Sequence, residues 1–412
     1  MSYQEFTIPQ NGIRLVHRQV NHTKIAHCGF VLDIGSRDEA EHEYGLAHFW
    51  EHMAFKGTRK RKAFHILNRL DSVGGDLNAF TTKEKIFFHA SVLDRYFENA
   101  LELLTDITFF STFPEREIKK EKSVILEEMS MYQDNPSDAI YDEFDAFLFG
   151  DHPLGKLILG DSESVKRFTR EDFLNFIGRH LNTEKLVLAS VSTLPFKKVK
   201  QLAQKYLSEI PRQTASQHRI APPTVKVRHE VQHKAIHQVH CLLGGQAFSR
   251  KHPKKIPLAI LVNLLGGPGM NTRLNLVLRE KYGLVYSIDT SYMVYNDAGA
   301  VTIGFATEPK TWERTQSLLF KELKKYREKA LGTRQLHQAK QQFMGQIAMG
   351  EESNSGYMLS LGRSILDEGR LQTLPELFAQ IESVTASDLL GLMNEVFDES
   401  RLSQLVFMPE KA

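Results

Sequence analysis

The chain has 412 residues, of which 42% are hydrophobic and 25% are charged. This length and composition predict a folded protein of about two domains. Its 52 basic and 50 acidic residues leave a net charge of +2, which excludes a global field that would favour nucleic acid or a membrane surface. Cys28 and Cys241 are too few for a disulfide framework or a thiolate zinc site.

The predicted elements begin with two strands, over residues 13–18 and 26–33, joined by a polar turn. Residues 46–55 contain no Gly or Pro and predict a helix. Further strands are expected within 76–90 as a hairpin and over 186–191 and 235–243, and further helices over 64–72, 93–109, 115–129 and 139–149.

Targeting and membrane segments are not predicted. Residues 1–6 show no basic segment followed by an apolar one, so no signal peptide is visible. The longest apolar stretch, around 256–265, contains Pro257 and Asn263 and falls short of the ~20 residues that a membrane span needs. We therefore expect a soluble, cytoplasmic protein.

The helix predicted over 46–55 carries the pattern His-x-x-Glu-His. His48 and His52 are four residues apart, so they lie on one helix face with Glu51 beside them. Two imidazoles one turn apart can hold one metal ion, and an adjacent carboxylate can take a proton from water on that metal. This order reverses His-Glu-x-x-His and is a zinc-hydrolase signature. On these residues alone, an exposed His/Glu helix face is the alternative.

A catalytic zinc ion needs a third protein ligand. The helix predicted over 115–129 offers carboxylates: Glu121 and Glu128 are seven residues apart on one stripe, and Glu127 is rotated by about 100° from Glu128. The residues alone leave open which of these three would bind a metal. An ordinary solvated, charged helix is the other interpretation.

Segments 35–39 and 45–58 together resemble the catalytic signature of the pitrilysin/insulinase family of zinc peptidases. The closest likeness is to the mitochondrial-processing-peptidase subfamily and its bacterial relatives. In that family the third ligand lies about 76 residues past the second histidine, in a Val-[Ile/Leu]-x-x-Glu-[Ile/Met] context. Glu128 lies 76 residues past His52, within Val-Ile-Leu-Glu-Glu-Met.

The resemblance implies roles for the residues around the motif. His48, His52 and Glu128 would bind Zn²⁺, one ion per chain. Glu51 would be the general base, and Glu121 would support the site by contacting a metal ligand and not the metal itself.

The resemblance also implies substrate-binding residues. The Gly-Gly-x-x-Asn-Ala pattern that ends in Asn78 and Ala79 is similar to the family's edge strand, to which the substrate backbone adds as a further strand. Arg279 and Tyr286, seven residues apart after a glycine-rich turn, match a pair that helps hold a substrate carbonyl in relatives. Without the family, Asn78 would close a hairpin turn, Arg279 would be a surface helix residue and Tyr286 a half-buried strand residue.

A second metal site is not predicted. Four histidines follow one another at short spacing, but no carboxylate accompanies them, and residues 235–243 indicate a strand in which His237 and His240 face opposite sides. The four are His229, His233, His237 and His240.

The polar, proline-bearing segment 211–226 predicts a linker between two domains. Residues 1–210 would form an N-terminal zinc-binding catalytic domain. Residues 227–412 would form a homologous C-terminal domain without zinc that contributes the Arg/Tyr pair. The resemblance implies an α+β fold in which each domain is a mostly antiparallel sheet with helices packed on it, the two paired as half of a clamshell.

The implied activity is that of a zinc-dependent endopeptidase acting on peptides or unfolded segments enclosed in a chamber. Pitrilysin-like relatives carry four such domains, so this chain is expected to form a homodimer or a heterodimer with a related subunit. Neither nucleic acid nor a membrane is an expected partner. The alternatives are a non-catalytic partner or assembly subunit of the same fold, and a zinc hydrolase acting on small molecules.

Overall fold

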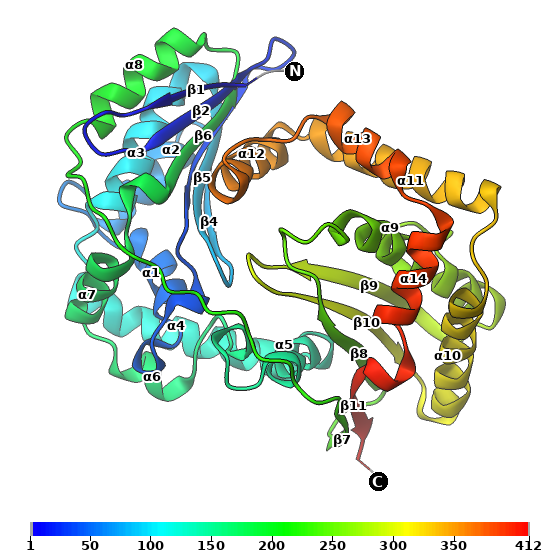
Figure 1. The fold of residues 1–412 in the computed structure, drawn as a ribbon. Coiled ribbons are helices and arrows are strands. Elements are labelled where there is room, and N and C mark those ends of the chain that lie inside the picture. The colour runs from blue at the N-terminus through cyan, green and yellow to red at the C-terminus, as the bar shows by residue number, and fades with distance from the viewer. Residues whose placement is uncertain (1–2, 411–412) are drawn as a thin grey trace. The chain divides into compact units, whose positions relative to one another are not determined.

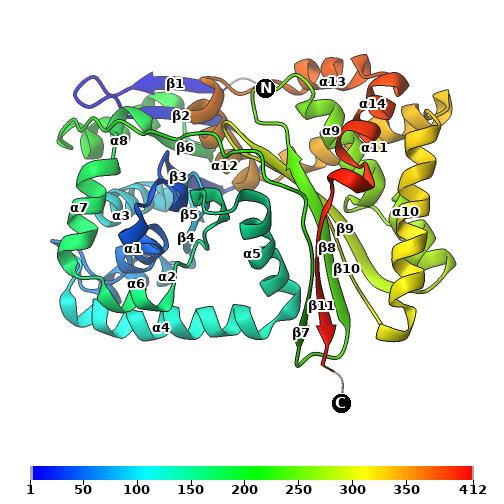
Figure 2. The same cartoon turned by 60° about the horizontal axis from the view of Figure 1, so that its bottom comes forward.

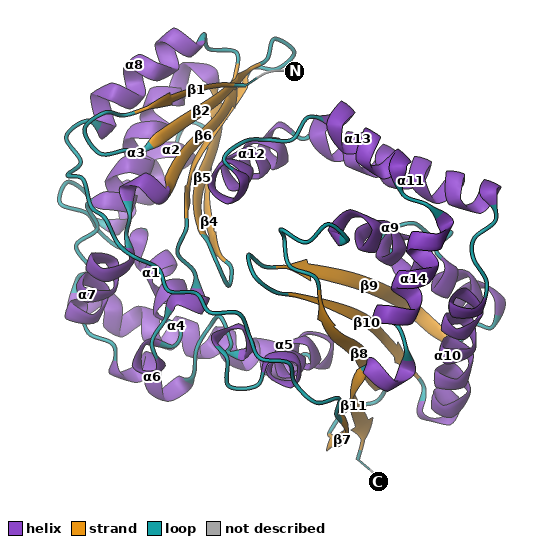
Figure 3. Ribbon diagram, in the orientation of Figure 1, coloured by secondary structure: helices purple, strands orange, loops and turns teal. Residues whose placement is uncertain are grey.

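The structure is a computed structural model that describes residues 3–410. Within these residues the chain forms two compact units, each built from three separate segments. The first unit contains the chain up to residue 129 together with 156–219 and 349–373, and the second contains 130–155, 220–348 and the chain from 374 onward. Each unit has one β-sheet flanked by helices, coloured orange and purple in Figure 3.

The sheet of the first unit has six strands in the order β1-β2-β6-β3-β5-β4 (Figure 1). β2 and β6 run parallel, and the other neighbouring strands are antiparallel. Every residue of β6 is buried, because helices cover both faces of this inner strand. The strands are β1 (Gln4–Thr7), β2 (Arg14–Gln19), β3 (Ile25–Leu32), β4 (Asp76–Thr81), β5 (Ile86–Leu93) and β6 (Leu186–Ser192).

Most helices of this unit pack on one face of the sheet, where Phe49, Trp50 and Phe88 are among the fully buried side chains. The opposite face is covered by α12 (Asn354–Glu368), whose Leu361 and Ile365 belong to a separate buried cluster. The helices of the first face are α1 (Leu46–Ala54), α2 (Ala63–Asp71), α3 (Phe97–Phe109), most of α4 (Glu115–Asp134), α6 (Ser162–Arg167), α7 (Arg170–His180) and α8 (Phe196–Leu207).

The sheet of the second unit has five strands in the order β7-β11-β8-β10-β9. Its strands are β7 (His229–Lys234), β8 (Val239–Ala247), β9 (Val285–Val294), β10 (Gly299–Thr307) and β11 (Ser403–Pro409). Helix α5 (Pro136–Phe149) covers one face. The other face carries α9 (Lys255–Gly266), a π-helical segment (Asn275–Lys281), α10 (Trp312–Glu328), most of α11 (Thr333–Glu352), α13 (Leu374–Ser383) and α14 (Ala386–Val396).

The two sheets share a topology. The order β2-β6-β3-β5-β4 in the first unit corresponds strand by strand to β7-β11-β8-β10-β9 in the second, and the first two strands of each series are parallel. Each sheet is otherwise antiparallel and packs helices on its faces. This confirms the predicted α+β fold of two mostly antiparallel domains.

The units do not follow the continuous domains predicted over 1–210 and 227–412. Helix α5 lies before the predicted linker, yet its Phe144 and Phe147 are buried against the second sheet. Helix α12 lies after the linker but belongs to the first unit. Hydrophobic patterning shows that a helix has an apolar face, but it does not show which of the two sheets that face packs against.

The two strands predicted over 13–18 and 26–33 are present as β2 and β3, and β6 lies between them in the sheet. One other local prediction was wrong. The strand expected over 235–243 begins only at Val239, so His237 lies outside it. His229 and His233 lie on a separate strand, β7.

The segment 211–226 has no regular secondary structure, as predicted for a linker. It is nevertheless anchored within the first unit. The side chain of Arg219 is 8% exposed, and its guanidinium donates to the carboxylates of Asp33 at 2.8 Å and Asp38 at 2.6 Å.

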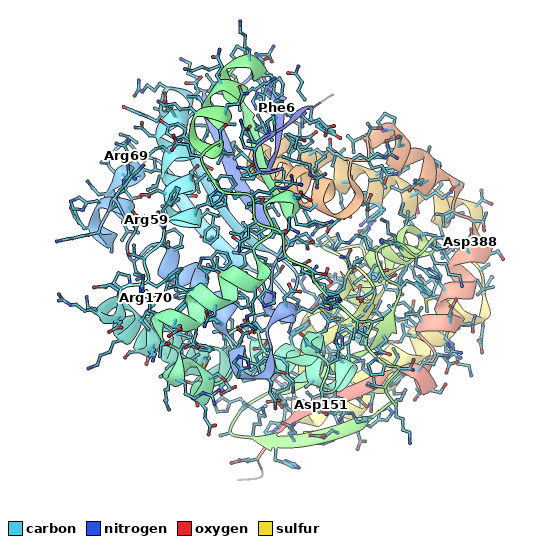
Figure 4. The ribbon with its side chains drawn as sticks, turned by 60° about the vertical axis from the view of Figure 1, so that its left-hand side comes forward. Phe6, Arg59, Arg69, Asp151, Arg170 and Asp388 are labelled. Atoms are coloured by element: carbon cyan, nitrogen blue, oxygen red, sulfur yellow. The ribbon has the colours of Figure 1, made fainter. Side chains whose placement is uncertain are left out.

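In contrast to Arg219, Arg59 and Arg170 are exposed on the surface of the first unit (Figure 4). None of the helices within residues 3–410 is long and apolar enough to cross a membrane.

Candidate metal centre

The start of helix α1 is set by two residues that precede it. Gly45 has φ +95°, a left-handed conformation that favours glycine, and a Cβ there would lie 2.4 Å from the carbonyl oxygen of Leu159. The carboxylate of Glu39 accepts hydrogen bonds from the backbone N–H groups of Gly45 at 3.0 Å and Ala47 at 2.7 Å. Glu39 thereby occupies donors that the first turn of the helix leaves unpaired. The orientation of α1 is fixed from its first residue.

Helices α1 and α4, labelled in Figures 1 and 2, carry the three predicted ligands, and the side chains of these residues lie close together. Glu128 Oε2 lies 3.4 Å from His52 Nε2 and 3.8 Å from His48 Nε2. One potential ligand atom from each residue lies within 4.8 Å of the others. Residues 3–410 contain this one group of three His, Cys, Asp or Glu side chains with such spacing. Glu127 is exposed and does not belong to it.

The charges around His52 favour a cation. Burial alone would lower the pKa of His52, but hydrogen bonds with Glu121 and Glu128 outweigh it and raise the pKa to about 9. Burial and the neighbouring His52 lower the pKa of His48 to about 4. The hydrogen bond with His52 lowers the pKa of the Glu128 carboxyl. A positive charge is therefore stabilised between the carboxylates that flank His52.

Glu121 orients His52 from the side opposite to Glu128. Its Oε1 lies 3.1 Å from His52 Nδ1, and its Oε2 pairs with Lys56 Nζ at 2.7 Å. Burial would raise the pKa of Glu121, but the hydrogen bonds from His52 and Lys56 outweigh it and lower the pKa. A carboxylate at Nδ1 holds the proton on that nitrogen and leaves the Nε2 lone pair for a metal.

The residues present fit a zinc ion. Two imidazole nitrogens and one carboxylate oxygen are a donor set of catalytic zinc, which keeps its fourth position for water or substrate. The Nε2 atoms of both histidines face the same oxygen of Glu128. His48, His52 and Glu128 could hold the ion, and Glu121 supports one of its ligands.

Glu51 lies beside this group and is held by the edge strand. Its Oε2 accepts a hydrogen bond of 2.7 Å from the hydroxyl of Thr81, at the end of β4. Burial raises the pKa of Glu51, and the hydrogen bond from Thr81 opposes that shift. A carboxylate with a raised pKa is suited to exchange protons near neutral pH.

Asn78 and Ala79 lie on β4, the edge strand of the first sheet. A cavity of about 270 Å³ lies between this strand and α1. Its wall contains Glu51, His52 and Glu121 beside Asn78 and Ala79 and the apolar side chains of Phe55, Leu67 and Leu77. The structure thus brings the predicted strand residues to the same cavity as the predicted general base.

Arg279 and Tyr286 belong to the second unit. Arg279 lies in the π-helical segment and its guanidinium is 5.6 Å from the ring centre of Tyr286 on β9. Tyr286 is 85% exposed, so the half-buried strand position expected from the residues alone was wrong. The predicted role of this pair in holding a substrate carbonyl stays a prediction.

Three supporting residues were missed by the sequence analysis. Glu39 holds the start of α1, Lys56 pairs with Glu121, and Thr81 binds Glu51. Thr81 could have been found because it continues the alternation of Leu77 and Ala79. Glu39 carries no such periodic signal.

Comparison with known proteins assigns the family. Residues 14–162 match the insulinase family (peptidase family M16), and residues 167–343 match the peptidase M16 inactive domain. An uncharacterized zinc protease of Rickettsia bellii is 31% identical over 397 residues, which cover 96% of each chain. This chain belongs to the M16 peptidase family. The uncharacterized zinc protease YmxG of Bacillus subtilis is 30% identical to this M16 chain over 397 residues, again 96% of each.

Solved structures share the M16 fold. A protease from Helicobacter pylori superposes with a TM-score of 0.92 at 22% identity, covering 99% of both chains. A peptidase M16 inactive domain from Pseudomonas fluorescens superposes with a TM-score of 0.91 at 20% identity, covering 100% of this chain and 99% of its own. At these identities the likeness concerns the fold alone.

Proposed function

We propose that this chain is a zinc-dependent endopeptidase that hydrolyses peptides or unfolded protein segments. The observation that carries the proposal is the convergence of His48, His52 and Glu128 beside Glu51, a carboxylate whose pKa is raised by burial. The relatives named as zinc proteases support the choice of metal.

The chain's own residues divide the work of hydrolysis. When bound by His48, His52 and Glu128, zinc lowers the pKa of water to about 7 and polarises a carbonyl. Glu51 accepts the proton of the attacking water and passes it to the leaving amine. Glu121 and Lys56 keep His52 in the tautomer whose Nε2 is a ligand.

The edge strand β4 is the proposed docking site for the peptide. A strand at the edge of a sheet has unpaired backbone groups, and a peptide that pairs with them is bound through its main chain whatever its side chains. Asn78 and Ala79 lie on this edge and on the cavity that contains Glu51. Recognition of extended backbone favours peptides and unfolded segments over small molecules.

The test is a peptide assay combined with metal analysis. The zinc-loaded protein should cleave internally quenched peptides, with kcat/KM rising as the peptides lengthen. Glu51→Gln should keep its zinc and lose about 10²–10⁴-fold in kcat, the range typical of general acid–base catalysis. The matched control is Glu127→Gln, the same change at an exposed neighbour of Glu128, which should leave zinc content and kcat unchanged.

Three results would argue against the proposal. A fully active Glu51→Gln variant would show that Glu51 is not the general base. Zinc-loaded wild-type protein that cleaves no peptide would favour the non-catalytic assembly subunit. Activity confined to small substrates, without gain from peptide length, would favour a small-molecule hydrolase.

We also propose that the chain acts as a homodimer, because the zinc group and the Arg/Tyr pair are both present in one sequence. A related subunit is therefore not needed to supply either. Light scattering should give about twice the mass of the chain for the active form. A stable and active monomer would contradict this assembly.

A further inference from the structure

The hydroxyl of Thr81 is the contact through which the first sheet reaches the proposed general base. Thr81 Oγ1 donates to Glu51 Oε2 at 2.7 Å, and the pair is partly buried. A hydrogen bond to an ionised carboxylate is about twice as strong as one between neutral groups. This bond fixes the position of one oxygen of the Glu51 carboxylate.

The strand pattern places the Thr81 side chain on the side of the metal helix. Along β4 the residues alternate between exposed and half-buried. Leu77, Ala79 and Thr81 are the half-buried set, and Leu77 and Ala79 line the cavity that contains Glu51. Since side chains in a strand alternate between faces, Thr81 lies on the same face as these two.

The backbone that follows Thr81 is fixed by a tight network. The N–H of Thr82 donates to the carbonyl of Lys85 at 2.7 Å, which closes the turn between β4 and β5. The N–H of Arg37 donates to the carbonyl of Lys83 at 2.7 Å, and the Arg37 guanidinium pairs with Glu84 at 2.6 Å in a buried ion pair. The Thr81 hydroxyl is therefore a preorganised donor and not a mobile surface group.

We propose that Thr81 is a positioning residue for peptide hydrolysis: its hydroxyl holds the Glu51 carboxylate in the orientation needed to take a proton from the attacking water. This inference rests on the proposed function. It adds that β4 has two tasks, because the strand proposed to pair with the peptide backbone also ends in the group that orients the base. Peptide register and base orientation are thus set by one strand.

The experiment compares three variants of the full-length, zinc-loaded protein. Thr81→Val keeps the shape of the side chain and removes the hydroxyl, so kcat should fall about 10- to 100-fold, as expected for the loss of a hydrogen bond to a charged group. KM should change less than about twofold and zinc content should not change, because the substitution keeps the backbone of β4 and the Thr81 hydroxyl contacts Glu51, which is not one of the three proposed metal ligands. Thr81→Ser keeps the hydroxyl and should restore kcat to within about threefold of wild type.

Thr108→Val is the matched control. The Thr108 hydroxyl is buried in α3 and has no hydrogen-bond partner among residues 3–410, so the same chemical change there should leave kcat and KM as in wild type. If Thr81→Val does not fold, as judged by circular dichroism, Thr81→Ala against Thr81→Ser provides the same comparison.

The outcomes separate the two proposals. Wild-type kcat in Thr81→Val, in a protein that is active, overturns the role of Thr81 and leaves the peptidase standing. An equal loss in Thr81→Ser and Thr81→Val, or a loss of zinc with the hydroxyl, also overturns it, because the effect is then one of packing or metal binding. A zinc-loaded wild type that cleaves no peptide overturns the proposed function, and the role of Thr81 with it.

Discussion

The two units have the same strand order and different chemistry. In each unit a pair of corresponding strands (β2 and β3, or β7 and β8) is followed by a helical segment and then by an edge strand, with the next strand pairing inward. In the first unit the helix is α1, which presents His48, Glu51 and His52 next to the edge strand β4. In the second unit the helix is α9, which packs on the edge strand β9 through buried aliphatic residues.

The difference shows which features a metal site needs beyond the fold. Helix α9 contains no His or Glu, and one of its few polar residues is the buried Asn263. Of the residues described, those of the second unit include no group of three potential ligands at metal-binding spacing. The architecture positions a helix beside an edge strand in both units, but among the described residues only those of the first unit include such a group of side chains.

The largest expected effect is loss of the metal on removing one ligand. Glu128→Gln takes away a charged donor, so zinc content should fall from about one ion per chain to near zero, and kcat/KM should fall by more than the 10–100-fold typical of outer-sphere changes. Metal analysis of the purified variant is the measurement. Zinc retained at half stoichiometry or more would show that Glu128 is not required to bind the metal.

Removal of Arg219 should weaken the first unit alone. Arg219→Ala removes the cationic partner of the Asp38 carboxylate and leaves Asp33 only Lys85, 3.8 Å away. Breaking a buried ion pair costs about 3–5 kcal/mol in the free energy of unfolding. Hydrogen exchange should accelerate in residues 33–38 while β9 and β10 stay as protected as before. Arg334→Ala, at an exposed position in the second unit, is the control. Equal acceleration in both units would contradict the anchoring of the linker to the first.

A smaller loss of stability is expected at acidic pH, and it should concern mainly the first unit. Outside the metal group, burial lowers the pKa of four histidines there and of one in the second unit; these are His17, His27, His89, His180 and His240. A histidine whose folded pKa lies below its unfolded value of about 6.5 stabilises the fold above that pH. This stability is lost as the pH falls below about 6.5.

The measurement is the urea midpoint at pH 7.5 and 5.5. His17 is fully buried, so His17→Gln should reduce the acid-induced drop, whereas His229→Gln at an exposed position of β7 should not. Hydrogen exchange at pH 5.5 should show the first unit opening before the second. An identical drop in wild type and His17→Gln would show that this histidine does not contribute.

Much of the fold could be predicted because its signals are local. The apolar period of residues 63–71 and the run of straight-chain helix formers after Pro114 reflect hydrogen bonds between residues three or four apart. Long-range pairing was harder: β6 inserts between β2 and β3 although about 150 residues separate it from them in the chain. The placement of α5 in the second unit and of α12 in the first could not be predicted either, because an apolar helix face does not specify the sheet that it packs against.

The candidate site divides in the same way. Helical periodicity alone put His48, Glu51 and His52 together, since one turn of α1 contains them. The family resemblance was needed to select Glu128, and it supplied Asn78 and Ala79 as well. Lys56 was not predicted because it pairs with Glu121 of another helix, and Glu39 was not predicted because no periodic pattern marks it.

The sequence by itself determined that two imidazoles and a carboxylate share one helical turn, because the backbone geometry of a helix is set within a few residues. Only the tertiary structure decided which carboxylate of α4 meets them. Neighbouring positions of a helix point about 100° apart, so the choice between Glu127 and Glu128 depends on how α4 is rotated against α1. That rotation is fixed by packing between segments 76 residues apart, and no local pattern encodes it.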